Sequence, residues 1–192
     1  AVGHCQRCRS VIEPLVSKQW FVKMEPLVKA AVDCVEDGRT QFVPERFTKT
    51  YTGWMENIRD WCISRQRKWG VPIPVVYCKE CGKEIIDDGI MQKVSDIFGE
   101  EGSDAWFAHD AEYFLPEGFE CPHCHKANGF EKETDIMDVW FDSGSSHAAV
   151  LKNRNYLKWP ADVYLEGADQ YRGWFQSCLL YTSPSPRDPK TS

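Results

Sequence analysis

Cysteine is the residue type whose number and spacing point most directly to chemistry in this sequence. The 192 residues include 9 cysteines, an odd number that cannot all pair as disulfides within the chain. Most of them form C-x2-C pairs, namely Cys5 with Cys8, Cys78 with Cys81, and Cys121 with Cys124. The chain opens without a basic-then-apolar leader, so we expect no secretion. Without that oxidising context, such pairs predict metal ligands rather than disulfides.

The second and third pairs together predict a closed metal site. Four thiolates, from Cys78, Cys81, Cys121 and Cys124, suit a tetrahedral structural zinc ion held between two knuckles. Four buried free thiols are the alternative, and His123 and His125 are possible substitute ligands. A thioredoxin-like redox role is disfavoured, because it needs one such pair in a βαβ setting.

The first pair, Cys5 and Cys8, has no partner pair of its own in the sequence. One knuckle cannot close a zinc site, so either its partners lie upstream of Ala1 or it binds nothing. His4 is a weaker candidate for a third ligand. The unmatched pair, together with an alanine as first residue, leads us to expect a piece of a larger protein.

A second group of candidate residues lies near the end of the chain. Glu166, Gly167, Asp169 and Gln170 fall at an expected strand-to-helix turn, where a carboxylate can bind an ammonium group or a ribose hydroxyl. Helix capping by Asp169 is the simpler alternative.

Other aromatic and basic residues also carry two interpretations. Trp140 and Trp174 are either core residues or walls of a pocket. The basic residues Arg65, Arg67 and Lys68 are either a solvated turn or a nucleic-acid contact.

Hydrophobic spacing predicts the elements that must position these residues. Helices are expected over 25–36 and 48–59, with further helical segments over 91–98, 105–114 and 147–151 and one carrying Trp174. Strands are expected over 19–22, 71–77 and 162–165. Residues 142–146 are expected to form a turn that caps the helix after them.

Composition describes an ordinary globular chain. The sequence is 42% hydrophobic and 27% charged, with a net charge of −6, which argues against binding to nucleic acid by bulk charge alone. No apolar run approaches the length of roughly 20 residues that spans a bilayer. The proline-rich tail over 181–192 is expected to be disordered or foreign.

Three segments carry a family resemblance. Asp60 to Pro74 (DWCISRQRKWGVPIP), Thr134 to Leu151 (TDIMDVWFDSGSSHAAVL) and Val163 to Leu180 (VYLEGADQYRGWFQSCLL) resemble the class I aminoacyl-tRNA synthetases of the isoleucyl, valyl and leucyl group. The last two are similar to the isoleucyl type in particular. Residues 1–59 are more similar to the valyl type, so either a chimera joined inside 60–66 or a divergent natural enzyme is expected.

The resemblance implies an α/β fold that is part of a class I Rossmann-type catalytic domain with a zinc-ribbon-like insertion. It divides the chain into the end of an editing insertion (1–40), the return into the catalytic domain (41–77), the zinc-binding insertion (78–132), the second half of the catalytic domain (133–180) and the tail (181–192).

The resemblance also implies an activity: ATP-dependent activation of isoleucine and its transfer to tRNA, with Mg²⁺ accompanying ATP. It assigns Glu166, Gly167, Asp169 and Gln170 to the aminoacyl-adenylate, Trp140 and Trp174 to the amino-acid pocket, and the four cysteines to zinc. Tyr171 stands where many isoleucyl enzymes have histidine. A monomeric, cytoplasmic parent enzyme with no membrane partner is expected.

The sequence contains no HIGH-type and no KMSKS-type motif, the two elements that hold ATP in this family. We therefore expect no catalytic residue in this section and no activity from the chain by itself. Two alternatives stay open: a section of a valine–tRNA ligase, and a stand-alone zinc-ribbon module that binds RNA.

Overall fold

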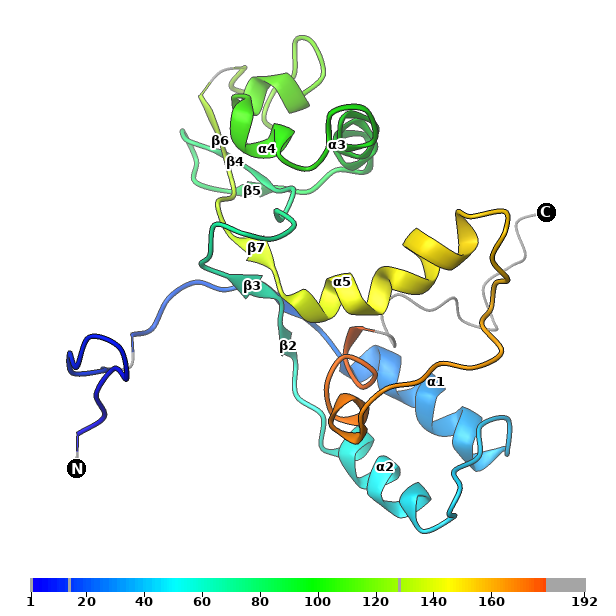
Figure 1. Cartoon of the computed structure of the whole chain (residues 1–192). Helices are drawn as coiled ribbons and strands as arrows, with labels where there is room; N and C mark the ends of the chain where they lie inside the picture. Colours follow the sequence, from blue (N-terminus) through cyan, green and yellow to red (C-terminus); the bar gives the residue numbers. More distant parts are fainter. Residues whose placement is uncertain (1, 14, 128, 179–192) are drawn as a thin grey trace.

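The computed structural model describes residues 2–13, 15–127 and 129–178. Two groups of elements lie at either end of a short connecting sheet, and the first residues project away from both (Figure 1). One group holds β4, β5, β6, α3 and α4, and the other holds α1, α2 and α5.

The chain combines helices and short strands. The helices are α1 (Glu25–Glu36), α2 (Phe47–Glu56), α3 (Asp88–Glu101), α4 (Ala105–Ala108) and α5 (Val139–Ser146), with the 3-10 helices η1 (Ala111–Phe114) and η3 (Ala168–Tyr171) and the π-helix η2 (His147–Lys152). The strands are β1 (Phe21–Val22), β2 (Trp61–Cys62), β3 (Ser64–Arg65), β4 (Val76–Cys78), β5 (Glu84–Ile85), β6 (Phe130–Lys132) and β7 (Ile136–Met137).

These strands form three small sheets, in the orders β1-β2, β3-β7 and β5-β4-β6. All of their pairs are antiparallel, with Ser64 opposite Met137 in the connecting sheet and Cys78 opposite Phe130 in the largest one. The described residues therefore contain the expected mixture of helices and strands, but none of their strand pairs is parallel.

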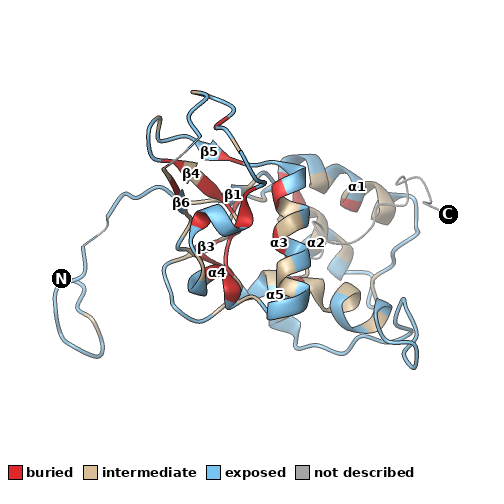
Figure 2. Cartoon of the chain, turned by 90° about the horizontal axis from the view of Figure 1, so that it is seen from above, coloured by how far each residue is buried: buried red, intermediate tan, exposed pale blue. Residues whose placement is uncertain are grey.

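The main hydrophobic core lies in the group formed by β4, β5, β6, α3 and α4. Trp106 and Phe114 are fully buried there, with ring centroids 4.7 Å apart, and Ile90 and Val94 of α3 pack beside them. Figure 2 shows the buried positions concentrated on these strands and helices. A smaller core joins Met24, Trp61 and Cys178, so the start of α1 and the end of the described chain pack together.

Most predicted helices form. The helix over 25–36 has the expected bounds, and the one expected over 48–59 is α2. The segment 91–98 extends to the whole of α3, because Asp87 accepts a hydrogen bond from the Ile90 N–H and caps the helix earlier. The segment 105–114 is divided into α4 and η1.

Two predicted elements are wrong. Residues 142–146 are not a turn, because Asp138 caps a helix that begins at Val139 and contains them. Gly144 is a close-packing position instead: a Cβ there would lie 2.4 Å from Cys178 Sγ. Residues 162–165 do not form a strand, since no described segment pairs with them, and Val163 and Leu165 are exposed.

Three further predicted elements form only in part. Of the strand expected over 71–77, only the last two residues lie in β4, and Pro72 forms an isolated bridge with Ile136. Of the strand expected over 19–22, only Phe21–Val22 pairs, and Phe21 is exposed. Trp174 lies in a series of turns that follows η3. Leu179, Leu180 and the tail over 181–192 lie outside the described residues.

Candidate functional site

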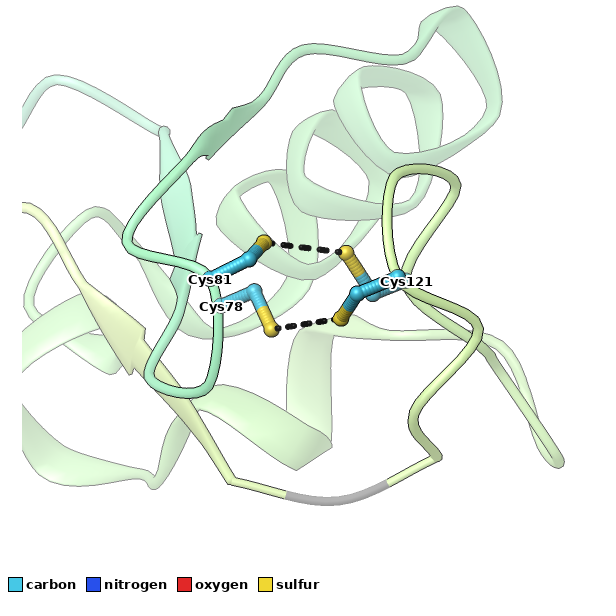
Figure 3. A group of neighbouring side chains, drawn as sticks. Cys78, Cys81 and Cys121 are labelled. Carbon is cyan, nitrogen blue, oxygen red and sulfur yellow. Dashed lines mark hydrogen bonds between the residues drawn. The ribbon is translucent and has the colours of Figure 1, made fainter.

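The structure brings four predicted ligands together. The Sγ atoms of Cys78, Cys81, Cys121 and Cys124 all lie within 4.8 Å of one another. Cys78 Sγ is 3.6 Å from Cys124 Sγ, and Cys81 Sγ is 3.8 Å from Cys121 Sγ (Figure 3). A disulfide bond requires an S–S distance of about 2 Å, so these pairs of sulfur atoms are too far apart to be disulfides. By contrast, a tetrahedral ion with Zn–S bonds of about 2.3 Å requires sulfur atoms about 3.8 Å apart. The four thiols therefore fit a metal ion.

Each cysteine pair sits on a tight backbone turn. Gly82 donates its N–H to the Cys78 carbonyl over 2.7 Å, and Cys78 donates its own N–H to Lys83 O. His125 and Cys121 repeat this pattern, with 2.9 Å between His125 N and Cys121 O. The fifth residue of each turn is left-handed, with φ of +68° at Gly82 and +58° at His125. These turns direct both sulfur atoms of a pair to the same side.

The pKa values of Cys121 and Cys124, two of the four cysteines, are shifted in opposite directions. Burial disfavours a charge on Cys121, but the N–H groups of His123 and Cys124 outweigh it and lower the pKa of Cys121 to about 6. The N–H of Lys126 lowers the pKa of Cys124, yet burial and the sulfur atoms of Cys78 and Cys121 together raise that pKa to about 12. One thiolate therefore forms readily, whereas several thiolates at this spacing need a cation among them.

The core behind the four cysteines is anchored by Lys132 and Glu133. The Lys132 ammonium donates to the carbonyls of Trp106 and His109 and lies 5.6 Å from the centroids of the Trp106 and Phe114 rings. Glu133 Oε2 accepts hydrogen bonds from Tyr77 over 2.6 Å and from Trp20 over 2.9 Å. Sequence reasoning missed this network, because its members are separated by up to 113 residues.

The N-terminal pair, Cys5 and Cys8, adopts the same turn as the other two. Arg9 N–H donates to Cys5 O over 2.9 Å, Cys5 N–H donates to Ser10 O over 2.8 Å, and Arg9 has a φ of +62°. Hydrogen bonding with Ser10 lowers the pKa of the exposed Cys8 thiol to about 7. His4 Nδ1 forms a hydrogen bond with Arg9 O over 2.9 Å. In the described part of the chain, no third or fourth metal-ligating side chain joins this pair.

The acidic turn near the end of the chain is open to solvent. Glu166 lines a cavity of about 440 Å³ together with Tyr164 and Ser146. Gly167 precedes η3, and a Cβ there would lie 2.7 Å from Asp169 Oδ1. Asp169 accepts a hydrogen bond from the Gln170 side chain and makes no helix-capping bond, so the capping interpretation of Asp169 is wrong.

The two predicted pocket tryptophans occupy different environments. Trp174 is buried, and its ring contacts Phe175 at 4.3 Å and Tyr164 at 5.5 Å. Trp140, in the first turn of α5, remains 37% exposed. Among the described residues, no ring contact joins these two tryptophans.

A buried carboxylate missed by sequence reasoning positions the start of α5. Asp138 is 5% exposed and forms an ion pair with Arg65. Trp61 Nε1 donates to Asp138 Oδ2 over 3.0 Å, and the Trp140 N–H donates to Oδ1 over 3.3 Å. Arg65 is therefore a structural cation and differs from the exposed Arg67 and Lys68.

The family follows from a comparison with known sequences. A family described as tRNA synthetases class I (I, L, M and V) matches residues 7–185. The chain belongs to this family of class I aminoacyl-tRNA synthetases.

Several curated relatives carry the name isoleucine–tRNA ligase. The chain is 52% identical over 177 residues to the one from Caldicellulosiruptor saccharolyticus and 52% identical over 177 residues to that of Desulfitobacterium hafniense. It is 51% identical over 179 residues to that of Carboxydothermus hydrogenoformans. Each match covers 92% of this chain and 19% of the relative, so the chain spans about a fifth of their length.

The length of the match to a single relative can be compared with the expectation of a chimera. Because a match of 177 residues leaves only 15 of the 192 residues outside it, the same relative aligns on both sides of the segment 60–66. A junction between two proteins is not needed to account for this match.

None of the helices in the described residues is long and apolar enough to cross a bilayer.

Proposed function

We propose that this chain is a section of an isoleucine–tRNA ligase, the enzyme that activates isoleucine with ATP and transfers it to tRNA. The observation that carries the proposal is the 52% identity to isoleucine–tRNA ligases over 92% of the chain. This identity extends well beyond the cysteine segment, which disfavours a stand-alone zinc-ribbon module.

In the proposed reaction, the isoleucine carboxylate attacks the α-phosphate of ATP, and pyrophosphate leaves. The acyl group of the adenylate then passes to a ribose hydroxyl at the end of the tRNA. Neither step needs a covalent enzyme intermediate, so catalysis depends on positioning and on stabilising the charge of the phosphoryl group. ATP brings Mg²⁺ as its counterion.

The residues around η3 are proposed to bind the adenylate. Glu166, Asp169 and Gln170 present carboxylate and amide groups that can hydrogen-bond a ribose hydroxyl or an ammonium group. The tight approach of Gly167 to Asp169 supports a role for glycine there, since any side chain would displace the carboxylate. Trp140 and Trp174 are proposed to contact the isoleucine side chain, and the burial of Trp174 between aromatic rings supports a fixed orientation.

We propose zinc as the metal of the four-cysteine site. Four thiolates in tetrahedral arrangement select a soft divalent ion, and zinc bound in this way has no open position for a substrate. Zinc supplies a structural crosslink between the two knuckles. The N-terminal knuckle, Cys5 and Cys8, is proposed to be half of a second site, which ligands from another part of the parent enzyme complete.

The proposed domain organisation follows the family. Residues 1–40 end an editing insertion, 41–77 return to the catalytic domain, 78–132 form the zinc insertion, and 133–180 belong to the Rossmann-type catalytic half, followed by a tail over 181–192. The separate core that contains Trp106 and Phe114 supports a zinc insertion that packs as a unit of its own. The parent enzyme is proposed to be a cytoplasmic monomer.

A graft into a relative tests the proposal. The chain would replace the matching 19% of the Caldicellulosiruptor saccharolyticus isoleucine–tRNA ligase. Amino-acid-dependent pyrophosphate exchange would then be measured with isoleucine and with valine. We expect the graft to prefer isoleucine by about 10- to 200-fold, as one methylene in a hydrophobic pocket allows. The matched variant Glu166→Gln is expected to lose most of the exchange.

Two results would contradict the proposal. A preference for valine would indicate a section of a valine–tRNA ligase. A folded, zinc-containing graft without exchange would exclude the assigned adenylate role. The isolated chain serves as a negative control: since it contains neither ATP-binding motif, it is expected to show no isoleucine-dependent exchange.

A further inference from the structure

We propose that Asp138, held in place by Arg65, is a positioning residue that orients Trp140 through the first turn of α5. The inference rests on the proposed function, since Trp140 is proposed there to contact the isoleucine side chain. Asp138 is 5% exposed, and this chain alone is sufficient to bury it. The environment of the carboxylate is therefore set by residues of this chain and not by the rest of the parent enzyme.

Both carboxylate oxygens of Asp138 make contacts, and they contact different parts of the chain. Oδ1 accepts the Trp140 N–H over 3.3 Å and so caps α5. Oδ2 accepts a hydrogen bond from Trp61 Nε1 over 3.0 Å and forms the ion pair with the Arg65 guanidinium. In addition, the Asp138 N–H donates to Ile63 O over 2.7 Å. One residue therefore connects the start of α5 to the segment that carries β2 and β3.

The Arg65 side chain is itself fixed on the backbone. Its Nη1 atom donates to the carbonyls of Cys62 and Ser64, both over 2.8 Å. The pairing of β3 with β7 places Arg65 opposite Ile136, two residues before Asp138, and α5 continues from the end of β7 (Figure 1). Because the guanidinium is a planar group with fixed N–H directions, these contacts determine where it meets the carboxylate. The ion pair therefore transmits the position of the connecting sheet to α5.

Helix capping alone does not require a buried charge at position 138. Serine caps a helix about as well as aspartate, and its single hydroxyl needs no ion pair. Removing a carboxylate and a guanidinium from water is costly, so a buried ion pair is weak evidence for a role in stability. What the second oxygen adds is a defined angle between α5 and the strand that carries Arg65. Trp140 is the second residue of α5, so this angle sets the direction from which its ring extends.

Fluorine NMR of the 192-residue chain, labelled with fluorotryptophan, tests the orientation directly. Asp138→Ser keeps a helix cap but loses the second oxygen, and Arg65→Met keeps the aliphatic stem but loses the guanidinium. We expect both variants to shift the resonances of Trp61 and Trp140, which are assigned by tryptophan-to-phenylalanine substitutions. The resonance of Trp106, in the core of the other group of elements, should stay in place.

Pyrophosphate exchange by the graft tests the consequence for the substrate. Asp138→Ser and Arg65→Met should each raise the KM for isoleucine by about tenfold and leave the KM for ATP unchanged, because only the side-chain pocket is displaced. A residue that served stability alone would lower the folded fraction, and with it kcat, without changing either KM. The double variant should also raise the KM for isoleucine by about tenfold, since both substitutions break the same connection.

The matched control is the same substitution at another helix cap. Asp87 caps α3 through the Ile90 N–H, as Asp138 caps α5. Among the described residues, no ion pair of Asp87 with a basic side chain is found. Asp87→Ser should therefore leave the Trp140 resonance and the KM for isoleucine unchanged. This control separates the loss of a carboxylate cap from the loss of the connection to Arg65.

Three results would overturn the inference: an unchanged Trp140 resonance in Asp138→Ser, an unchanged KM for isoleucine in an active graft with that substitution, or a double variant whose KM rises by the product of the single effects. The NMR measurement needs no activity, so it decides the orientation of Trp140 even if the graft shows no exchange, which would count against the proposed function alone. An active graft whose KM values do not respond would overturn the inference and leave the proposed function intact.

Discussion

The N-terminal knuckle, Cys5 with Cys8, and the paired knuckles of Cys78 to Cys124 share one backbone turn but differ in their surroundings. In all three turns the N–H of the fifth residue bonds to the carbonyl of the first cysteine. Cys78 and Cys121 are fully buried, whereas Cys8 is exposed. A C-x2-C sequence therefore forms the turn in both regions, but long-range packing is required to assemble a metal site.

The packing that joins the paired knuckles is visible in the strands. β4 ends at Cys78, which lies opposite Phe130 of β6, and Phe130 packs at 5.6 Å from Phe119, two residues before Cys121. Within the described residues, the strand pairing of the N-terminal knuckle is limited to one isolated bridge, between His4 and Val11. The difference between the two regions is therefore one of tertiary contacts.

The largest expected effect comes from removing a ligand of the paired knuckles. Cys121→Ser should abolish zinc binding and destabilise the chain by more than about 4 kcal/mol, because structural metal binding is coupled to folding. Chemical unfolding in the presence of zinc measures the change. Cys8→Ser is the matched control, and it should alter the free energy of unfolding by less than about 0.5 kcal/mol. Equal effects of the two substitutions would contradict the distinction between the regions.

The second-largest expected effect distinguishes the contribution of the hydrophobic core to stability from that of the bound metal. Trp106→Ala should cost about 3–5 kcal/mol, because it leaves a cavity beside Phe114 and removes the hydrogen bond from Trp106 Nε1 to Glu133 O. Thermal unfolding with zinc bound measures it, and Trp69→Ala at the surface is the control. If Trp106→Ala is no more harmful than Trp69→Ala, the metal alone holds the paired knuckles together.

A pH-dependent effect tests how the region of the paired knuckles is tied to Trp20. Burial raises the pKa of Glu133, but hydrogen bonds from Tyr77, Trp20 and the backbone outweigh it and lower this pKa below its ordinary value of 4.5. A lowered pKa in the folded state contributes stability above the unfolded pKa, and this stability is lost as the pH falls through the folded pKa. Glu133→Gln should therefore reduce stability at neutral pH and flatten its acid dependence below about pH 4.5.

The measurement is the free energy of unfolding of both proteins between neutral pH and pH 3. Acid also protonates the cysteine ligands, and this contribution is common to both chains. The difference between wild type and Glu133→Gln should shrink as the pH falls. A constant difference would mean that Glu133 does not need its charge to hold Trp20 and Tyr77.

The smallest expected effect on stability comes from substitutions at the N-termini of α3 and α4, the helices that pack in the region of the paired knuckles. Asp87→Ala should destabilise the chain by about 1 kcal/mol, because the carboxylate caps α3 at the Ile90 N–H. Asp104→Ala, at the corresponding position before α4, should have almost no effect, since the Asp104 side chain makes no capping bond. Thermal unfolding of both variants checks the difference, and a reversed order would contradict the capping assignment.

Local patterns in the sequence predicted local structure well. The apolar spacing over 25–36 gave the bounds of α1, and the C-x2-C spacing identified the residues that converge. The strand over 162–165 failed because a short apolar segment forms a strand only when a partner strand lies beside it. The turn over 142–146 failed because glycine and serine suggested a break, whereas Gly144 permits close contact with Cys178 inside a helix.

The long-range polar contacts could not be predicted. Trp61 and Asp138 are separated by 77 residues, and Trp20 and Glu133 by 113, so no local spacing connects them. Likewise, Arg65, Arg67 and Lys68 formed one basic cluster in the sequence. The fold separates Arg65, which pairs with buried Asp138, from the two residues that remain exposed.

The metal content of the purified chain tests the central claim most directly. After exhaustive dialysis against zinc-free buffer, the wild-type chain and a Cys5→Ser, Cys8→Ser double variant should both retain close to one zinc ion per chain, and Cys78→Ser should retain none. This outcome is expected if the four cysteines complete a metal site by themselves and the N-terminal knuckle, with two ligands, does not. The account would be contradicted by a wild-type chain without metal, or by loss of the bound zinc in the N-terminal double variant.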